Sequence, residues 1–253
     1  MRVVGLALPV VFGMTVAVTS CSSATVTVKP TGSATPSASG PTGSGSPAGS
    51  PAASPAASPA EPISLVPVPA GYTRVGGAAQ GISVAAPASW APIDPTKENI
   101  DSAARKLGIH GLSVTTLEQD MEAVQKMHGI IVVDVKSGID NPRHFNRNLN
   151  FFCAVSGVNN VGATGVPLLR TAAAAELQQI GATHLAQRDL DIGGVPGVET
   201  SWQVSTSGSG LLYESQLEVM PKPDKVCTVT LSVAAGESAG NILSVAAATA
   251  QFP

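Results

Sequence analysis

The apolar and polar positions divide the chain into three stretches. An almost unbroken apolar run, VVGLALPVVFGMTVAVTS, follows Arg2. Residues 22–62 then consist mainly of Ser, Pro, Ala, Gly and Thr, with Lys29 and Glu61 as their only charges. From about residue 63 onward, apolar residues recur with the periods of strands and helices. The pattern therefore predicts a leader, a linker and one folded domain of roughly 190 residues, which is an ordinary domain size.

Seven segments of the domain have the apolar and β-branched composition of strands. They are residues 81–87, 130–135, 148–156, 183–192, 198–205, 211–220 and 226–234. GGVPG, STSGSG and PKPDK separate the last four and are turn material, so these strands are expected to pair antiparallel as a meander. Trp202 alternates with Val204 on one of them, which predicts one buried face. Tyr213, Leu217 and Val219 alternate in the same way on the next strand.

Four helices are expected as well. They are residues 95–107, 115–128, 167–180 and 241–251. Asp94 is expected to cap the first, and the sequence TTLE forms a capping box for the second. On this second helix Leu117, Met121 and Val124 form one apolar stripe. Together, the helices and the meander predict an α+β fold, in which helices pack on the faces of an antiparallel sheet.

The end of the leader predicts where the protein is located. A basic residue, an apolar core of about a dozen residues and small residues at the end are typical of a secretory signal peptide. Val18-Thr19-Ser20-Cys21 fills the positions of a bacterial lipobox, so the chain resembles bacterial lipoproteins here. By that resemblance, the signal peptide 1–20 is removed and the Cys21 thiol carries a diacylglyceryl group, whose acyl chains (palmitate, for example) anchor the protein. The alternatives are an ordinary signal peptide that ends near a cysteine, or an uncleaved leader that serves as the anchor.

The composition of the rest agrees with a lipid-anchored protein on the extracellular face of the cell membrane. Residues 21–62 are expected to be the lipidated cysteine and a disordered linker, because they cannot bury enough apolar surface to fold. Residues 63–253 are then a single extracellular domain. The chain has 14 Lys and Arg against 17 Asp and Glu, and loss of Arg2 leaves 13 against 17. This acidic balance argues against nucleic acid as a partner and against binding of anionic lipids through a basic patch.

The two cysteines of the domain, Cys153 and Cys227, form an even pair in a protein expected to be exported. Both fall in strand-like runs. A disulfide between them is therefore predicted, and two buried free thiols are the alternative. A structural metal site would need more ligands than two thiols without a neighbouring histidine, so no metal is expected.

No stretch of the chain has the motif of a known catalytic or cofactor site. The G-x-S-x-G, S-x-x-K, H-E-x-x-H, C-x-x-C and P-loop patterns are all absent, and the four histidines are scattered without ligand spacing. The sequence thus predicts no cofactor and no enzyme. Glu199, Glu214 and Glu218 lie on the predicted meander, where cross-strand carboxylates are expected on solvated faces.

One polar cluster, DNPRHFNRNLN at residues 140–150, is a candidate binding site. Arg143, His144 and Arg147 can converge there on a phosphate or a carboxylate. The alternative is a solvated turn that leads into a strand, which Asp140 and Pro142 favour.

Gly81, Val84, Pro87 and Trp90, followed by the Ala-rich helix 167–180 and by strands to residue 234, resemble the Mog/PsbP-like domains. Among these, the chain is similar to actinobacterial lipoproteins of the LpqN/LpqT type. The resemblance implies a surface-exposed accessory or binding role without catalysis. The expected partners are the membrane, through the lipid on Cys21, and another envelope protein or a lipid. The alternative function is a carrier that holds a lipid or another apolar ligand between the sheet and the helices, and an enzyme with an uncatalogued site is a third hypothesis.

Overall fold

The computed structural model describes residues 66–253 except 107–120, 123, 141–144, 158–159 and 207–209. The predictions for the leader, for Cys21 and for the linker therefore lie outside the described residues. The same holds for Leu117 and for the capping box at 115–118. No helix in the described part of the chain is long and apolar enough to cross a membrane.

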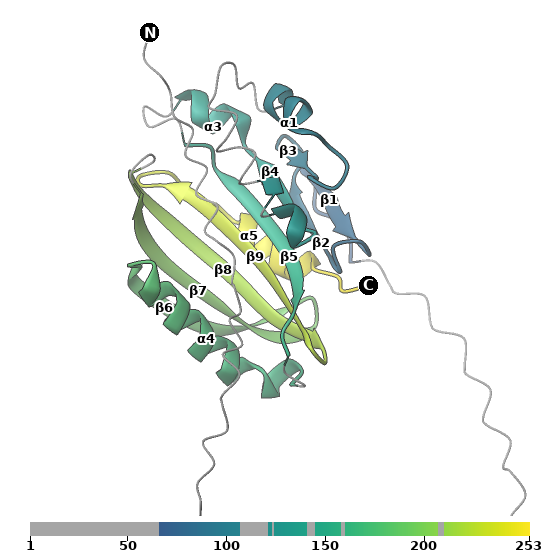
Figure 1. Ribbon diagram of the computed structural model, residues 1–253, viewed down its shortest axis with the longest axis vertical. Coiled ribbons are helices and arrows are strands. Elements are labelled where there is room, and N and C mark those ends of the chain that lie inside the picture. Colours follow the sequence, from purple (N-terminus) through teal and green to yellow (C-terminus); the bar gives the residue numbers. More distant parts are fainter. Residues whose placement is uncertain (1–65, 107–120, 123, 141–144, 158–159, 207–209) are drawn as a thin grey trace, which may run out of the picture. The chain divides into compact units, whose positions relative to one another are not determined.

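The strands form a seven-stranded antiparallel sheet, in the order β3-β4-β5-β9-β8-β7-β6, and a separate two-stranded hairpin, β1-β2 (Figure 1). The strands are β1 (Tyr72–Gly77), β2 (Ile82–Pro87), β3 (Ala91–Ile93), β4 (Ile130–Val133), β5 (Asn148–Val155), β6 (Thr183–Ile192), β7 (Val195–Thr206), β8 (Gly210–Lys222) and β9 (Lys225–Ala234). The helices are α1 (Ile100–Lys106), α3 (Val135–Asp140), the short 3-10 helix η1 (Gly162–Thr164), α4 (Val166–Gln179) and α5 (Ile242–Thr249). The predicted α+β architecture is confirmed.

The meander β6-β7-β8-β9 is also confirmed, and its turns explain it. Gly193 and Gly194 have φ angles of 59° and 84°, which let two residues join β6 to β7. Asp224, with φ of 61°, takes part in the equally tight turn between β8 and β9. Strand β9 then pairs with β5 from the first half of the domain, so the two halves share one sheet.

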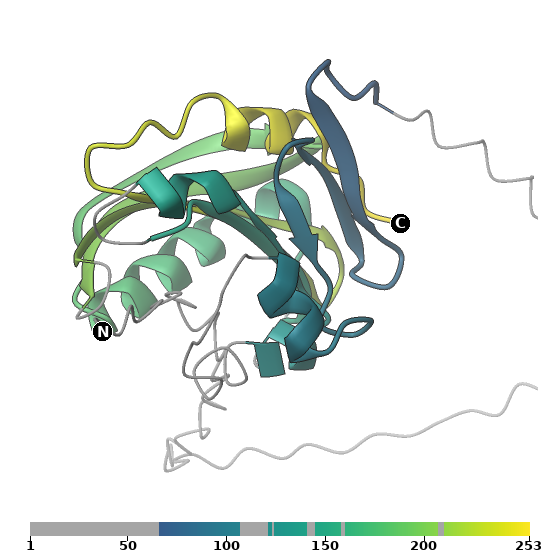
Figure 2. The same cartoon turned by 90° about the horizontal axis from the view of Figure 1, so that it is seen from above.

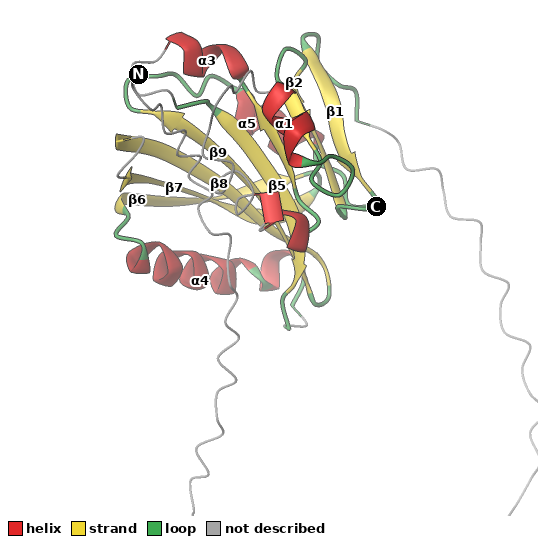
Figure 3. Cartoon of the chain, turned by 45° about the horizontal axis from the view of Figure 1, so that its top comes forward, coloured by secondary structure: helices red, strands yellow, loops and turns green. Residues whose placement is uncertain are grey.

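Each face of the large sheet is covered by a different helix (Figure 2). On one face, α5 packs against the sheet and beside strand β2 of the hairpin, which also contacts the sheet (Figure 3). This face holds the main apolar core, which includes Trp90, Phe151, Leu217, Val229, Leu231 and Ile242. On the other face, α4 lies across β6, β7 and β8. The candidate site is on this second face.

Two predictions about local structure were wrong. The helix predicted from residue 95 begins at Ile100, because Asp94 closes a separate turn before it. The Asp94 side chain accepts a hydrogen bond from the Thr96 N–H, and the Asp94 backbone carbonyl accepts one from the Lys97 N–H. Asn99 caps the helix instead, with Oδ1 accepting from the Ser102 N–H at 3.0 Å. Helix α3 was not predicted, nor were the short strands β1 and β3.

The second predicted helix is described in part. Residues 121–122 and 124–126 are helical, and Met121 and Val124 are buried against Ile93 and Ile131, as the apolar stripe predicts. The helix ends at Gly129, whose N–H bonds to the carbonyl of Val124.

Candidate functional site

The sheet face that α4 covers is apolar at its two ends and polar in its middle. On β8, alternate side chains on this face are Leu212, Glu214, Gln216, Glu218 and Met220, and β9 follows the same order. On β7, Thr200 and Trp202 lie between Val198 and Val204. We call the middle positions the polar band, which consists of Gln187, Thr200, Glu214, Gln216, Glu218, Thr228, Thr230 and Ser232. The register of the strands brings these side chains together on four neighbouring strands, β6 to β9.

Helix α4 is held over the polar band by its two ends. Leu169 packs with Val198, Met220 and Val226 beyond one end of the band. Leu177 packs with another apolar cluster, formed by Phe145, Trp202, Val204, Leu212 and Ala234, beyond the other end. Ala173 lies one helical turn from each leucine and is buried too. The fully buried side chain that α4 places over the middle of the sheet is therefore only a methyl group.

Some side chains of the polar band form hydrogen bonds with one another. The Ser232 hydroxyl donates to Glu214 Oε1 at 2.8 Å, and the Thr230 hydroxyl donates to Gln216 Oε1 at 3.1 Å. At the β6 side, Gln187 Nε2 donates to Thr200 Oγ1 at 3.2 Å and to a carbonyl of α4 at 3.0 Å. These bonds fix the middle of the band between β6 and β9.

The remaining polar atoms of the band are buried without a partner. Glu218 is 0% exposed, and neither of its carboxyl oxygens has a hydrogen bond of good geometry, although the Gln216 side chain lies close enough to lower its pKa slightly. The Thr228 hydroxyl, directly opposite on β9, is also unpartnered. Glu214, 1% exposed, has one unpartnered oxygen, and Trp202 Nε1 opposite it on β7 has no hydrogen-bond partner. A buried polar atom without a partner costs about 1–3 kcal/mol, so such atoms are rare in native proteins.

Burial also changes the acidity of both carboxyl groups. Desolvation raises the pKa of Glu214 to about 7. The hydrogen bond from Ser232 lowers this pKa in part, and so does the indole of Trp202, which lies close to the carboxyl group but without good hydrogen-bond geometry. Desolvation, with the negative charge of Glu176 on α4, raises the pKa of Glu218 to about 8, against a smaller lowering by Gln216. Both groups thus hold a proton for much of the time near neutral pH.

The arrangement is suited to binding more than to acid–base chemistry. Glu214 and Glu218 are four residues apart on one strand, which separates them by about 13 Å. Carboxyl pairs that work together in glycoside hydrolases are about 5–10 Å apart. Among the residues that the structure describes, no three His, Cys, Asp or Glu side chains form a group that could hold a metal ion.

The polar band was missed by the sequence analysis, which expected Glu214 and Glu218 on a solvated face. That expectation was wrong for both, whereas Glu199 lies on the opposite face and pairs with Arg188 of β6 at 2.9 Å. The sequence signal for the band is that polar residues occupy every second position on successive strands, while the positions between them are apolar.

Of the predicted binding residues, Arg143 and His144 lie outside the described residues. Arg147 is part of a structural network: its Nε donates to Asp134 at 3.2 Å, and its Nη1 donates to the Ser238 carbonyl at 3.1 Å. Its guanidinium also lies 5.9 Å from the ring centre of Trp90. A ligand role of these residues stays a prediction.

The predicted disulfide between Cys153 and Cys227 is confirmed. The two residues face each other on β5 and β9, with their Cα atoms 4.0 Å apart. They lie on the α5 side of the sheet, away from the polar band. The disulfide joins chain positions separated by 74 residues and thereby fixes the central strand pair.

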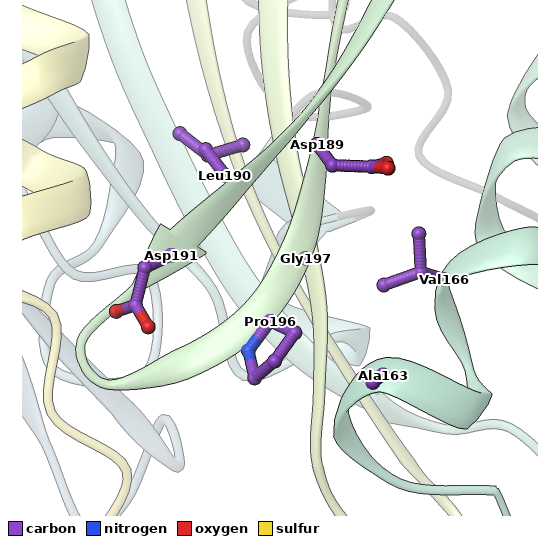
Figure 4. Close-up of a pocket in the computed structure, with 7 residues that line it drawn as sticks. All are labelled: Ala163, Val166, Asp189, Leu190, Asp191, Pro196 and Gly197. Carbon is purple, nitrogen blue, oxygen red and sulfur yellow. The ribbon is translucent and has the colours of Figure 1, made fainter.

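A depression of about 380 Å³ lies where the start of α4 meets the β6–β7 hairpin (Figure 4). Ala163, Val166 and Pro196 line it, and Asp189 extends toward α4, where Arg170 pairs with it at 2.7 Å. Asp191 turns away and accepts the Gly194 N–H at 2.6 Å. Since its two carboxylates are already paired or hydrogen-bonded, this depression is a weaker candidate than the polar band.

Comparison with known proteins gives no family. No family model matches the chain, and no curated protein matches it. Among solved structures, the solution structure of cyanobacterial PsbP (CyanoP) from Synechocystis sp. PCC 6803 is similar, with 13% identity over 73% of this chain and 94% of that chain and a TM-score of 0.39. A similarity at this level carries no argument about family or function, so the resemblance to Mog/PsbP-like domains and to actinobacterial lipoproteins stays a prediction.

Proposed function

We propose that the chain is a lipid-anchored accessory protein, whose domain binds a ligand or a partner on the extracellular face of the membrane without turning it over. The anchor is the lipid on Cys21, and residues 22–62 are the tether. The lipobox and the Ser/Pro/Ala-rich composition support this. The Cys153–Cys227 disulfide supports an exported domain, because such bonds persist in oxidising compartments.

The observation that carries the binding role is the unpartnered, fully buried carboxyl of Glu218. Natural proteins satisfy buried polar groups, and the exceptions concentrate at functional sites, where the loss of stability is tolerated. Two more unpartnered atoms lie in the band, on Glu214 and Thr228, and a third lies beside it, on Trp202. A ligand with polar groups would supply the missing partners.

The alternative function, a carrier that holds a lipid or another apolar ligand, is less well supported by the side chains at this face of the sheet. Leu169 and Leu177 already fill the apolar ends of the α4 interface, and the unpartnered atoms belong to the polar middle. The small side chain of Ala173, in the middle of the α4 interface, is the feature that favours it. A lipid would have to place its head group, and not its acyl chain, over the polar band.

The anchor is tested by metabolic labelling of the full-length protein with a fatty-acid analogue in an actinobacterial host. We expect the wild type to be labelled and to partition into detergent. The Cys21→Ala variant should remain unlabelled and should be released or stall in processing. An unlabelled wild type would contradict lipidation.

The binding role is tested by capturing the full-length protein from native membranes and analysing everything that co-purifies by untargeted mass spectrometry. A specific lipid, metabolite or protein, enriched over a control lipoprotein, is expected. Enrichment of nothing, or hydrolysis of a screened substrate that one point substitution abolishes, would contradict the proposed non-catalytic binding role.

A further inference from the structure

The polar band contains two buried acids that form no ion pair with any residue that the structure describes. In the part of the chain that the structure describes, seven ion pairs are formed, and none involves Glu214 or Glu218. Each of these carboxyl groups is nevertheless almost completely removed from water. A carboxylate in such a place is strongly disfavoured unless a positive charge compensates it.

The charged groups that face the band from neighbouring elements do not provide this compensation. From α4, Arg170 is already paired with Asp189 of β6, and Glu176 adds a negative charge that acts on Glu218. The facing positions of β7 and β9 are Val198, Thr200, Trp202, Thr228, Thr230 and Ser232, which carry no charge. Among the described residues, none that faces the band forms an ion pair with Glu214 or Glu218.

We infer that the polar band is a binding site for an organic cation, an ammonium or guanidinium group that enters between α4 and β8 and pairs with Glu218 or Glu214. This inference rests on the proposed binding function and names its ligand class. The cation would also donate to the unpartnered Thr228 hydroxyl oxygen at the Glu218 end. At the Glu214 end, it would lie beside the indole of Trp202.

The spacing of the carboxyl groups favours an organic cation over a metal ion. A calcium or magnesium ion needs several oxygen ligands within about 2.6 Å of one point. Glu214 and Glu218, about 13 Å apart along their strand, cannot share such an ion. An ammonium group needs only one carboxylate and a few further acceptors, which either end of the band provides.

Binding of a cation is expected to depend on pH with a definite sign. Because the pKa values of Glu214 and Glu218 are raised to about 7 and about 8, each carboxyl must release its proton to pair with the cation. The affinity should then increase as pH rises toward about 8. A neutral hydroxylated ligand would show the opposite trend, because it binds to the protonated acids.

The two tryptophans of the chain provide the readout. Trp202 lies beside the polar band, whereas Trp90 lies in the core on the opposite face. The full mature chain, labelled with ¹⁵N in its indole groups and held in detergent, is titrated with n-butylamine, and n-butanol of similar size serves as the uncharged control. The amine should shift the Trp202 indole resonance saturably and leave Trp90 unchanged, and the butanol should do neither.

Matched variants assign the effect to the acids. Glu218→Gln together with Glu214→Gln should weaken amine binding by about tenfold or more. Glu199→Gln, on the other face of β7, should bind as the wild type does. Dispersed amide spectra of each variant verify that it is folded.

Three results would overturn the inference: no shift with the amine, an equal shift with butanol, or undiminished amine affinity in the double variant. The proposed function fails separately. If the double variant still captures the same partner from native membranes as the wild type, the binding role stands and the cation site is wrong. If neither protein captures anything, the binding role fails, whatever the amine titration shows.

Discussion

Glu218 makes the stability of the domain fall as pH rises. Its pKa in the folded state is raised from 4.5 to about 8, so over this window the unfolded chain has lost the proton that the folded chain still holds. The folded state binds more protons than the unfolded state, and linkage then requires the free energy of unfolding to decrease with pH. At about 1.4 kcal/mol per pH unit, Glu218 alone removes about 3 kcal/mol between about pH 5 and about pH 8.

The Glu218→Gln variant removes this titration and nearly preserves the size of the side chain. We expect it to be more stable than the wild type at about pH 8 and to lose most of the wild-type slope, the difference in slope amounting to about 3 kcal/mol over the window. Glu214→Gln should give a smaller change in the same direction, because the pKa of Glu214 is raised only to about 7.

The measurement is urea unfolding of the full chain at a series of pH values, followed by tryptophan fluorescence, with free energies extrapolated to water. Glu199→Gln is the control, since Glu199 is on the other face and is paired with Arg188. A wild-type stability that is flat or rises between about pH 5 and about pH 8 would refute the reasoning. So would a Glu218→Gln variant that falls in parallel with the wild type.

Three further predictions concern the disulfide, the linker and Arg147. Replacing both Cys153 and Cys227 with Ser should lower the free energy of unfolding by about 4 kcal/mol, since the bond closes a loop across 74 residues; an unchanged melting temperature under oxidising conditions would contradict this. Deleting residues 22–62 should leave a cooperative thermal transition unchanged, and calorimetry that shows its loss would contradict the tether. Arg147→Ala should destabilise the domain by about 1–3 kcal/mol in the same urea assay, because it removes the ion pair with Asp134; an effect on ligand capture without destabilisation would instead favour the predicted anion site.

The elements that were predictable share one property: their signals are local. GGVPG and PKPDK specify the hairpin turns, and period-two alternation specifies the strands between them, so the meander follows from the sequence. Helix α4 has Pro167 at its start and Gly181 after its end. The disulfide followed from an even number of cysteines in two strand-like runs, without any knowledge of the register.

The elements that were missed depend on competition between neighbours. Asp94 has a side chain that suits a helix cap, but its own hydrogen bond to Thr96 closes a separate turn, and Asn99 takes the capping position. The burial of Glu214 and Glu218 could not be inferred from β8 alone, because alternation defines two faces and does not say whether a helix covers the polar one. Their burial depends on α4, whose ends are fixed by leucines far from β8 in the sequence.

The position of the polar band within the fold accounts for how the domain tolerates it. A buried carboxyl weakens the α4 interface, but the apolar clusters around Leu169 and Leu177 hold the helix at both ends. Below the band, β9 is bonded to β5 by the disulfide and packs on its other face against the α5 core. The two apolar clusters and the disulfide therefore hold the elements around the acids in place. The unfavourable burial of the acids lowers the stability of the domain without changing its fold. A rigid frame around unpaired buried acids would suit the proposed binding site, because a ligand that pairs with the acids would stabilise the folded state.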